Sequence, residues 1–220
     1  MKSWYQIANS IVKIYINHFI NNIQISGKEN IPVGPKIIVA NHPNATDGLM
    51  LPSVFPEKLH FMIQASVFET PFIGRILAYA EQIPVVSGKG RQALSLAREK
   101  LAKGGSVVIF PEGRLNNDEM LHRGQIGAAM LTVQTGLPLL PLGFYVPPDA
   151  LQVINGYIEN RATSARWQIG GNCFIRVGNS MQLKGDMQSG KRSGNLREYT
   201  QQIMANIGEL VNQAKHDAGE

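Results

Sequence analysis

The chain has 220 residues, of which 44% are hydrophobic and 17% are charged, and its formal net charge is +5. This composition excludes a disordered chain and is sufficient for one domain with a buried core. The basic excess suits an anionic partner, but no basic run is interleaved with aromatic residues, so nucleic acid is not expected. The single cysteine, Cys173, excludes an intrachain disulfide and indicates a reducing compartment, and the five histidines have no metal-ligand spacing.

The first predicted element is an amphipathic helix over residues 1–22, ahead of a domain over residues 23–220. Its apolar side, at 100° per residue, carries Trp4, Ile7, Ala8, Ile11, Ile14, Tyr15 and Phe19. Polar residues interrupt the segment, so we do not expect it to span a membrane. Two interpretations stay open: the helix packs on the core, or it lies in a membrane interface with Trp4 and Tyr5 at headgroup level.

Apolar runs alternate with helical patterns along the rest of the chain. We expect strands at 23–26, 36–40, 59–64, 81–86, 106–110 and 137–144, with one or two more within 168–185. We expect helices at 45–54, 70–80, 89–103, 124–135 and 196–214. Continuous apolar strands that alternate with helices predict a single α/β domain, with a largely parallel central sheet flanked by helices.

A polar segment, NHPNATD, follows the strand at 36–40 directly. Ligands in α/β sheets bind beyond the carboxyl ends of strands, so this position favours a functional site. Pro43 predicts extended backbone at His42 and a helix that begins at Pro43, with His42 as its cap and Asp47 in its second turn. A carboxylate beside an imidazole fixes the tautomer and stabilises the imidazolium, which makes His42 a candidate general base. The simpler alternative is a polar cap with a solvated Asp47.

A second polar segment, PEGRLNND, follows the strand at 106–110. Gly113 permits close approach of the backbone to a substrate, and the guanidinium of Arg114 offers a fork of donors for phosphate. The simpler alternative is a tight turn with an ion pair between Glu112 and Arg114 at the surface.

These segments together resemble the glycerolipid acyltransferase family, which includes the lysophosphatidic acid (1-acylglycerol-3-phosphate) acyltransferases. The family's Asn-His-x4-Asp block is similar to NHPNATD, its Phe-Pro-Glu-Gly block to FPEG, and its proline-centred strand to GLPLLPLGF. The segments ISGKENIP and LHRGQIGAAMLTVQTG also fit the layout of the family, so the resemblance runs over most of residues 23–185.

Two positions depart from the family pattern. The second block of the family usually ends in an arginine that binds the acceptor's phosphate, but Ser87 stands there in this chain, and Lys89 or Arg91 are candidate replacements. The third block usually continues Gly-Thr-Arg-Ser, whereas Arg114 follows Gly113 directly. Both departures leave the acceptor open.

The resemblance implies acyl transfer from an acyl thioester, either acyl-CoA or acyl carrier protein, to a hydroxyl of a lysophosphatidic acid-like glycerolipid. No metal or further cofactor is expected. The implied site has His42 as base, Asp47 as its orienting carboxylate, and Glu112, Gly113, Arg114, Lys89 and Arg91 around the acceptor's head group. We expect a peripheral protein on the cytoplasmic face of a membrane, bound through the N-terminal helix.

Alternative functions remain at this point. The acceptor could be another lysophospholipid, an amino-lipid or a glycolipid, or the protein could bind lipid without catalysis. A serine hydrolase is not expected, because the chain contains no G-x-S-x-G elbow.

Overall fold

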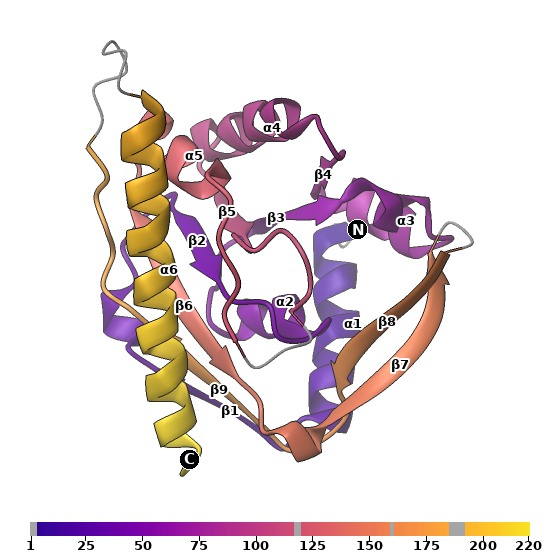
Figure 1. Cartoon of the computed structure of the whole chain (residues 1–220). Coiled ribbons are helices and arrows are strands. Elements are labelled where there is room, and N and C mark those ends of the chain that lie inside the picture. The colour runs from indigo at the N-terminus through magenta and orange to yellow at the C-terminus, as the bar shows by residue number, and fades with distance from the viewer. Residues whose placement is uncertain (1–3, 117–119, 159–160, 185–191) are drawn as a thin grey trace.

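Seven strands form the central sheet of the computed structural model, in the order β1-β9-β6-β2-β5-β3-β4 (Figure 1). The structure describes residues 4–116, 120–158, 161–184 and 192–220. The sheet strands are β1 (Asn22–Ser26), β2 (Ile37–Ala40), β3 (Leu59–Gln64), β4 (Ile83–Val85), β5 (Ser106–Ile109), β6 (Leu139–Tyr145) and β9 (Asn172–Val177). All neighbouring pairs are parallel except β6 with β9, so the predicted α/β domain with a largely parallel sheet is confirmed.

Helices cover both faces of this sheet and explain why its central strands are continuously apolar. The helices are α1 (Trp4–Phe19), α2 (Asp47–Met50), α3 (Ile73–Tyr79), α4 (Gly90–Ala102), α5 (Gly127–Thr135) and α6 (Arg192–Asp217). Short 3-10 turns are η1 (Lys28–Asn30), η2 (Leu51–Ser53), η3 (Ala65–Glu69) and η4 (Pro148–Ala150). Ile38 and Ala40 face a core shared with α1, α2 and η2, whereas Ile37 and Val39 face α4, α5 and α6. Every residue of β2 is therefore buried.

Two parts of the fold differ from the predicted elements. Strands β7 (Leu151–Ile158) and β8 (Arg161–Gln168) form an antiparallel hairpin that was not predicted, and it projects from the sheet as a separate ribbon (Figure 1). The helix predicted over 45–54 is wrong: α2 is one turn long and is followed by η2. Pro52 has no N–H to continue the α-helical ladder, which explains the change to a 3-10 turn.

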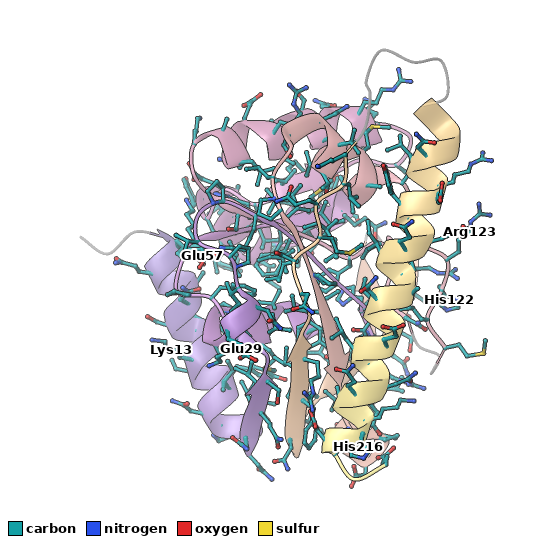
Figure 2. All side chains as sticks on the ribbon, turned by 90° about the vertical axis from the view of Figure 1, so that its left-hand side faces the viewer. Lys13, Glu29, Glu57, His122, Arg123 and His216 are labelled. Atoms are coloured by element: carbon teal, nitrogen blue, oxygen red, sulfur yellow. The ribbon has the colours of Figure 1, made fainter. Side chains whose placement is uncertain are left out.

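Helix α1 is bound to the domain through part of its apolar side. Tyr15 and Ile16 pack against the core, and the hydroxyl of Tyr5 donates to the main-chain carbonyl of Glu57 (3.3 Å). Glu57 lies near the start of the helix (Figure 2). Ile11, Ile14 and Phe19 of the apolar side are exposed, as is Lys13 of the same helix. The helix thus has both a core-facing and an unpartnered apolar surface. Residues 1–3, and the side chains of Trp4 and Ile7, lie outside the described part of the chain.

Candidate active site

His42 and Asp47 meet at the carboxyl end of β2. The Nδ1 atom of His42 lies 3.1 Å from Oδ2 of Asp47, so the predicted meeting of these two side chains is confirmed. The imidazole stacks on the ring of Phe110, at the end of the neighbouring β5, with 3.9 Å between ring centroids and 10° between planes. The side chain of His42 is 19% exposed and that of Asp47 is 1% exposed. Because Nδ1 faces the carboxylate, Nε2 is the nitrogen left to exchange a proton with a substrate.

Asn44 holds the carboxylate of Asp47 from two sides. Its main-chain N–H donates to Oδ2 (2.9 Å), and its side-chain Nδ2 donates to Oδ1 (2.6 Å). Its Oδ1 accepts from both the main-chain N–H (2.9 Å) and the hydroxyl of Thr46. Such local side-chain bonds compete with helical hydrogen bonds, so α2 begins only at Asp47. The prediction of a helix that begins at Pro43 and is capped by His42 is therefore wrong.

The environment of Asp47 sets its titration. Burial raises the pKa of the Asp47 carboxyl above its ordinary value, although the hydrogen bonds with His42 and Asn44 act in the opposite direction. Once ionised, this carboxylate lies in a site shielded from water, where its attraction for an imidazolium is stronger than at the surface. The arrangement therefore suits a histidine that gains a proton during a reaction.

Glu112 connects the loop after β5 to the loop after β2. Its carboxyl is 5% exposed, and Oε1 accepts from the main-chain N–H of His42 (3.2 Å). Its Oε2 accepts from Nδ2 of Asn116 (2.8 Å) and from the main-chain N–H of His122 (3.0 Å). Because Oε1 accepts from the main chain of His42, Glu112 helps to position the His42 loop, and its contact with an acceptor stays a prediction. Among the described residues, the alternative surface pair of Glu112 with Arg114 is not formed.

Gly113 and Arg114 continue the same turn toward solvent. Gly113 has φ of +70°, which favours glycine, and a Cβ there would lie 2.1 Å from Nε2 of Gln125 and displace that side chain. Its N–H donates to the carbonyl of Phe110 (3.0 Å) and is not free to bind an oxyanion. Arg114 is exposed beyond the turn.

Among the described residues, Lys89 and Arg91 make no hydrogen bond or ion pair with His42, and their contact with an acceptor stays a prediction. Both lie at the start of α4, just after β4, and both are exposed. In the sheet order, β4 is the third strand from β2 on the β5 side, which corresponds to roughly 14 Å between strand axes. The sequence alone contains no signal for this order.

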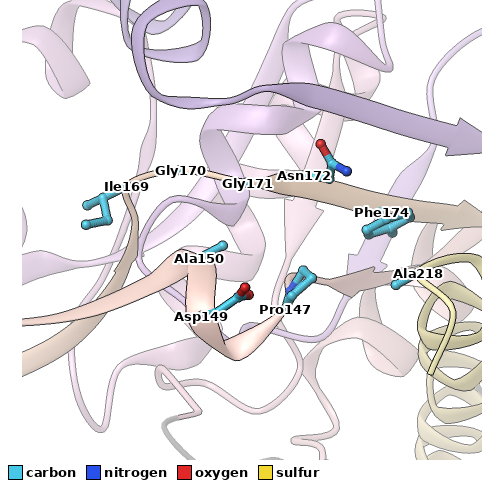
Figure 3. A pocket seen from close by; sticks show the side chains of 9 residues that line it. All are labelled: Pro147, Asp149, Ala150, Ile169, Gly170, Gly171, Asn172, Phe174 and Ala218. Carbon is cyan, nitrogen blue, oxygen red and sulfur yellow. The ribbon is translucent and has the colours of Figure 1, made fainter.

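Two hollows lie near this end of the sheet. The larger, of about 430 Å³, is lined between η4 and β9 (Figure 3), and Asp149 is the only ionisable side chain among the nine residues that line it. The smaller, of about 90 Å³, borders the loop after β2 through Asn41 and Pro43. The smaller hollow borders the loop that carries His42 through the two residues that flank it, whereas His42 itself is not among the residues that line either hollow.

Asn41 fixes the wall between the smaller hollow and β6. Its Nδ2 donates to the carbonyl of Phe144 (2.9 Å), and its Oδ1 accepts from the N–H of the same residue (2.8 Å). Neither Asn41 nor Asn44 was predicted as a site residue from the sequence. The patterns that could have found them are an asparagine directly after a strand, for Asn41, and an asparagine three residues before an aspartate, for Asn44. Over the described residues, no group of three or more His, Cys, Asp or Glu side chains is arranged to hold a metal ion.

Comparison with known proteins places these strand ends in a family. A family model described as Acyltransferase matches residues 22–145, which is more than half of the chain. The chain is 32% identical over 148 residues to a 1-acyl-sn-glycerol-3-phosphate acyltransferase of Pseudomonas aeruginosa, covering 60% of this chain and 57% of that protein. It is 32% identical over 133 residues to a lyso-ornithine lipid O-acyltransferase of the same organism, covering 59% and 49%. The chain thus spans about half the length of these relatives.

A solved structure has the same fold. The crystal structure of PlsC, the 1-acyl-sn-glycerophosphate (LPA) acyltransferase from Thermotoga maritima, matches with a TM-score of 0.66 and 19% identity, over 99% of this chain and 79% of that chain. At this identity the likeness concerns the fold alone. The family match, by contrast, contains β2 and β5 with the loops that carry His42, Asp47 and Glu112. The chain therefore belongs to the acyltransferase family.

Proposed function

We propose that the protein transfers an acyl group from an acyl thioester to a hydroxyl of a lysophosphatidic acid-like glycerolipid. The observation that carries the proposal is the hydrogen-bonded pair of His42 and Asp47, located at a strand end inside the family match. The names of the relatives from P. aeruginosa support a lysolipid acceptor with a free hydroxyl. A protein that only binds lipid has no need of a base held in this way.

The proposed reaction uses Nε2 of His42 as general base. It takes the proton of the acceptor hydroxyl while the oxygen attacks the thioester carbon, and Asp47 holds the resulting imidazolium. The tetrahedral intermediate then collapses, the carbon–sulfur bond breaks, and the thiolate takes the proton from His42. A hydroxyl is a poor nucleophile near neutral pH, so a positioned base of this kind contributes roughly 10²–10⁴ in rate.

A different acceptor for the same reaction is the second candidate. Ser87 replaces the arginine usual for the family, and Lys89 and Arg91 lie at the far edge of the sheet, on the β4 side. An acceptor without a phosphate monoester, such as an amino-lipid, fits these observations.

An acceptor screen tests both candidates. One radiolabelled acyl-CoA, and the same acyl group on acyl carrier protein, are each offered with lysophosphatidic acid, lysophosphatidylcholine or lyso-ornithine lipid in vesicles. The first proposal predicts labelled product and equimolar free thiol with lysophosphatidic acid. Product only with the other acceptors supports the second candidate, and thiol release that no acceptor stimulates contradicts both.

We also propose that α1 binds a membrane surface. Ile14 is 69% exposed and Ile11 is 51% exposed on the side that the core does not cover, and Lys13 of the same helix is exposed as well. A basic protein with such a surface suits an anionic bilayer. Over the described residues, no helix has both the length and the hydrophobicity to cross a bilayer. The peripheral location at a cytoplasmic face stays a prediction.

Flotation with phosphatidylglycerol vesicles tests this surface. The double substitution Ile11→Asn and Ile14→Asn should reduce the bound fraction severalfold, while Val33→Asn, at a fully exposed position outside α1, should leave it unchanged. Equal binding of all three proteins would remove α1 from the membrane contact.

A further inference from the structure

The smaller hollow carries two cations from elements outside the family match. Arg166 of β8 and Lys215 of α6 line it, together with Asn41 and Pro43 of the loop that contains His42. Across the described residues, neither Arg166 nor Lys215 has a carboxylate within ion-pair distance. Two cations without an ion-pair partner thus line a hollow that borders the two residues flanking the proposed base.

Both cations are held in place relative to the catalytic loop. The main-chain carbonyl of Arg166 accepts from the N–H of Ala45 (2.8 Å), within the loop between His42 and Asp47. The Nζ of Lys215 lies 5.6 Å from the centre of the Tyr145 ring, which also lines the hollow. One main-chain bond therefore ties the backbone of Arg166 to the loop, and one ring contact places the ammonium of Lys215 beside the hollow.

Nearby carboxylates do not cancel these charges. Asp217, two residues after Lys215, is bound by both Nε and Nη2 of Arg176. Asp47 and Glu112 are buried and accept their hydrogen bonds from the loops. Glu220 is the one carboxylate side chain among the residues that line the hollow, and it forms no ion pair with Arg166 or Lys215 among the described residues.

We propose that Arg166 and Lys215 bind a phosphate group of one substrate of the acyl transfer. The inference rests on the proposed function and names the subsite that function requires, because phosphate is the charged group common to a lysophosphatidic acid-like acceptor and to the CoA of the donor. A guanidinium and an ammonium together match phosphate in charge and in donors. Ser87, on the β4 side of β2, cannot make the phosphate contact of the arginine that is usual for the family. Arg166 and Lys215 would make a cationic contact of this kind on the β6 side of β2.

The test compares two double variants. Arg166→Gln with Lys215→Gln removes both charges from the hollow, and Arg98→Gln with Lys103→Gln removes two exposed charges from α4 as a matched control. In the variant with Arg166→Gln and Lys215→Gln, called the hollow variant, the KM of either the acyl donor or the acceptor should rise by about tenfold or more, with kcat within about twofold of the wild type. The control variant should leave both KM values unchanged. The charge-preserving pair Arg166→Lys and Lys215→Arg should recover most of the affinity, which separates a lost charge from a damaged fold.

The substrate whose KM rises identifies the source of the phosphate. If it is the acceptor, monoacylglycerol, which has no phosphate, should be acylated equally by the wild type and the hollow variant. If it is the donor, an acyl-pantetheine without the nucleotide should be used equally by both. Unchanged KM values for both substrates in a folded hollow variant would overturn the proposal.

A binding measurement separates this proposal from the proposed function. Titration calorimetry with inorganic pyrophosphate and with CoA needs no turnover, so it decides the subsite even if no acyl transfer is found. The wild type and the control should bind at least one of these probes about tenfold more tightly than the hollow variant does. Equal affinity in all three proteins, or no binding by the wild type, contradicts the phosphate subsite.

Discussion

Asn44→Ala is the substitution that most directly probes how the catalytic loop is built. Asn44 is 1% exposed, and its side chain makes three hydrogen bonds: one to the carboxylate of Asp47 and two from Thr46. The alanine removes all three and leaves buried polar atoms of Asp47 and Thr46 without these partners.

The magnitude follows from the kinds of bond that are lost. The bond to Asp47 is charge-assisted and contributes about 1.5–3 kcal/mol, and each of the other two contributes about 0.5–1.5 kcal/mol. The expected loss is about 3–5 kcal/mol in the free energy of unfolding, which lowers Tm by roughly 10 °C in a domain of this size. Thr46→Val removes only the hydroxyl bond and should cost about 1 kcal/mol.

Activity should change in a defined direction as well. A donor to a carboxylate favours its charged form, so the loss of the Asn44 amide raises the pKa of Asp47 further above its ordinary value. If activity needs ionised Asp47, the kcat of the variant should begin to fall at a higher pH than the kcat of the wild type as the solution is made more acidic. The assays are urea unfolding and kcat against pH; a variant with wild-type stability and an unshifted acid limb would refute this account of the loop.

Three further predictions concern the rest of the fold. Burial lowers the pKa of His60 below its ordinary value of 6.5. The stability that neutral His60 contributes is therefore present above pH 6.5 and is lost as the pH falls through the folded-state pKa. In urea titrations, His60→Gln should make the free energy of unfolding fall less steeply over this pH range, and an unchanged slope would contradict this. Cys173 is fully buried and burial raises the pKa of its thiol, so iodoacetamide should label it only on unfolding, and rapid labelling of native protein would argue against the core position. A Cβ on Gly143 would lie 2.4 Å from the main-chain carbon of Leu210, so Gly143→Ala should cost at least about 2 kcal/mol, whereas Gly156→Ala has open space and should cost little by thermal melting.

The central strands and the two strand-end segments were predictable from the sequence. Residues 37–40 and 107–110 are continuously apolar because β2 and β5 are buried on both faces, and this pattern is typical of parallel strands between helix layers. Because these strands are parallel neighbours, the polar residues that directly follow them lie at the same edge of the sheet. The contact between His42 and Asp47 was therefore foreseeable, although the loop geometry that produces it was not.

The remaining features depend on contacts between distant segments. The hairpin of β7 and β8 is largely exposed and has no apolar run to mark it; it is attached through main-chain bonds such as that from Ala45 to Arg166. Arg166 and Lys215 became visible as a pair only when the hairpin and α6 were placed in space. The place of Lys89 relative to His42 also depends on the strand order, which sequence distance does not reveal.

The most direct test of the account is the turnover of His42→Ala, with a labelled acyl thioester and the acceptor that the screen identifies. If Nε2 of His42 takes the hydroxyl proton, kcat should fall by roughly 10²–10⁴ while Tm and substrate binding stay close to the wild type. Turnover within about threefold of the wild type, in a variant shown to be folded, would contradict the role of His42 as general base.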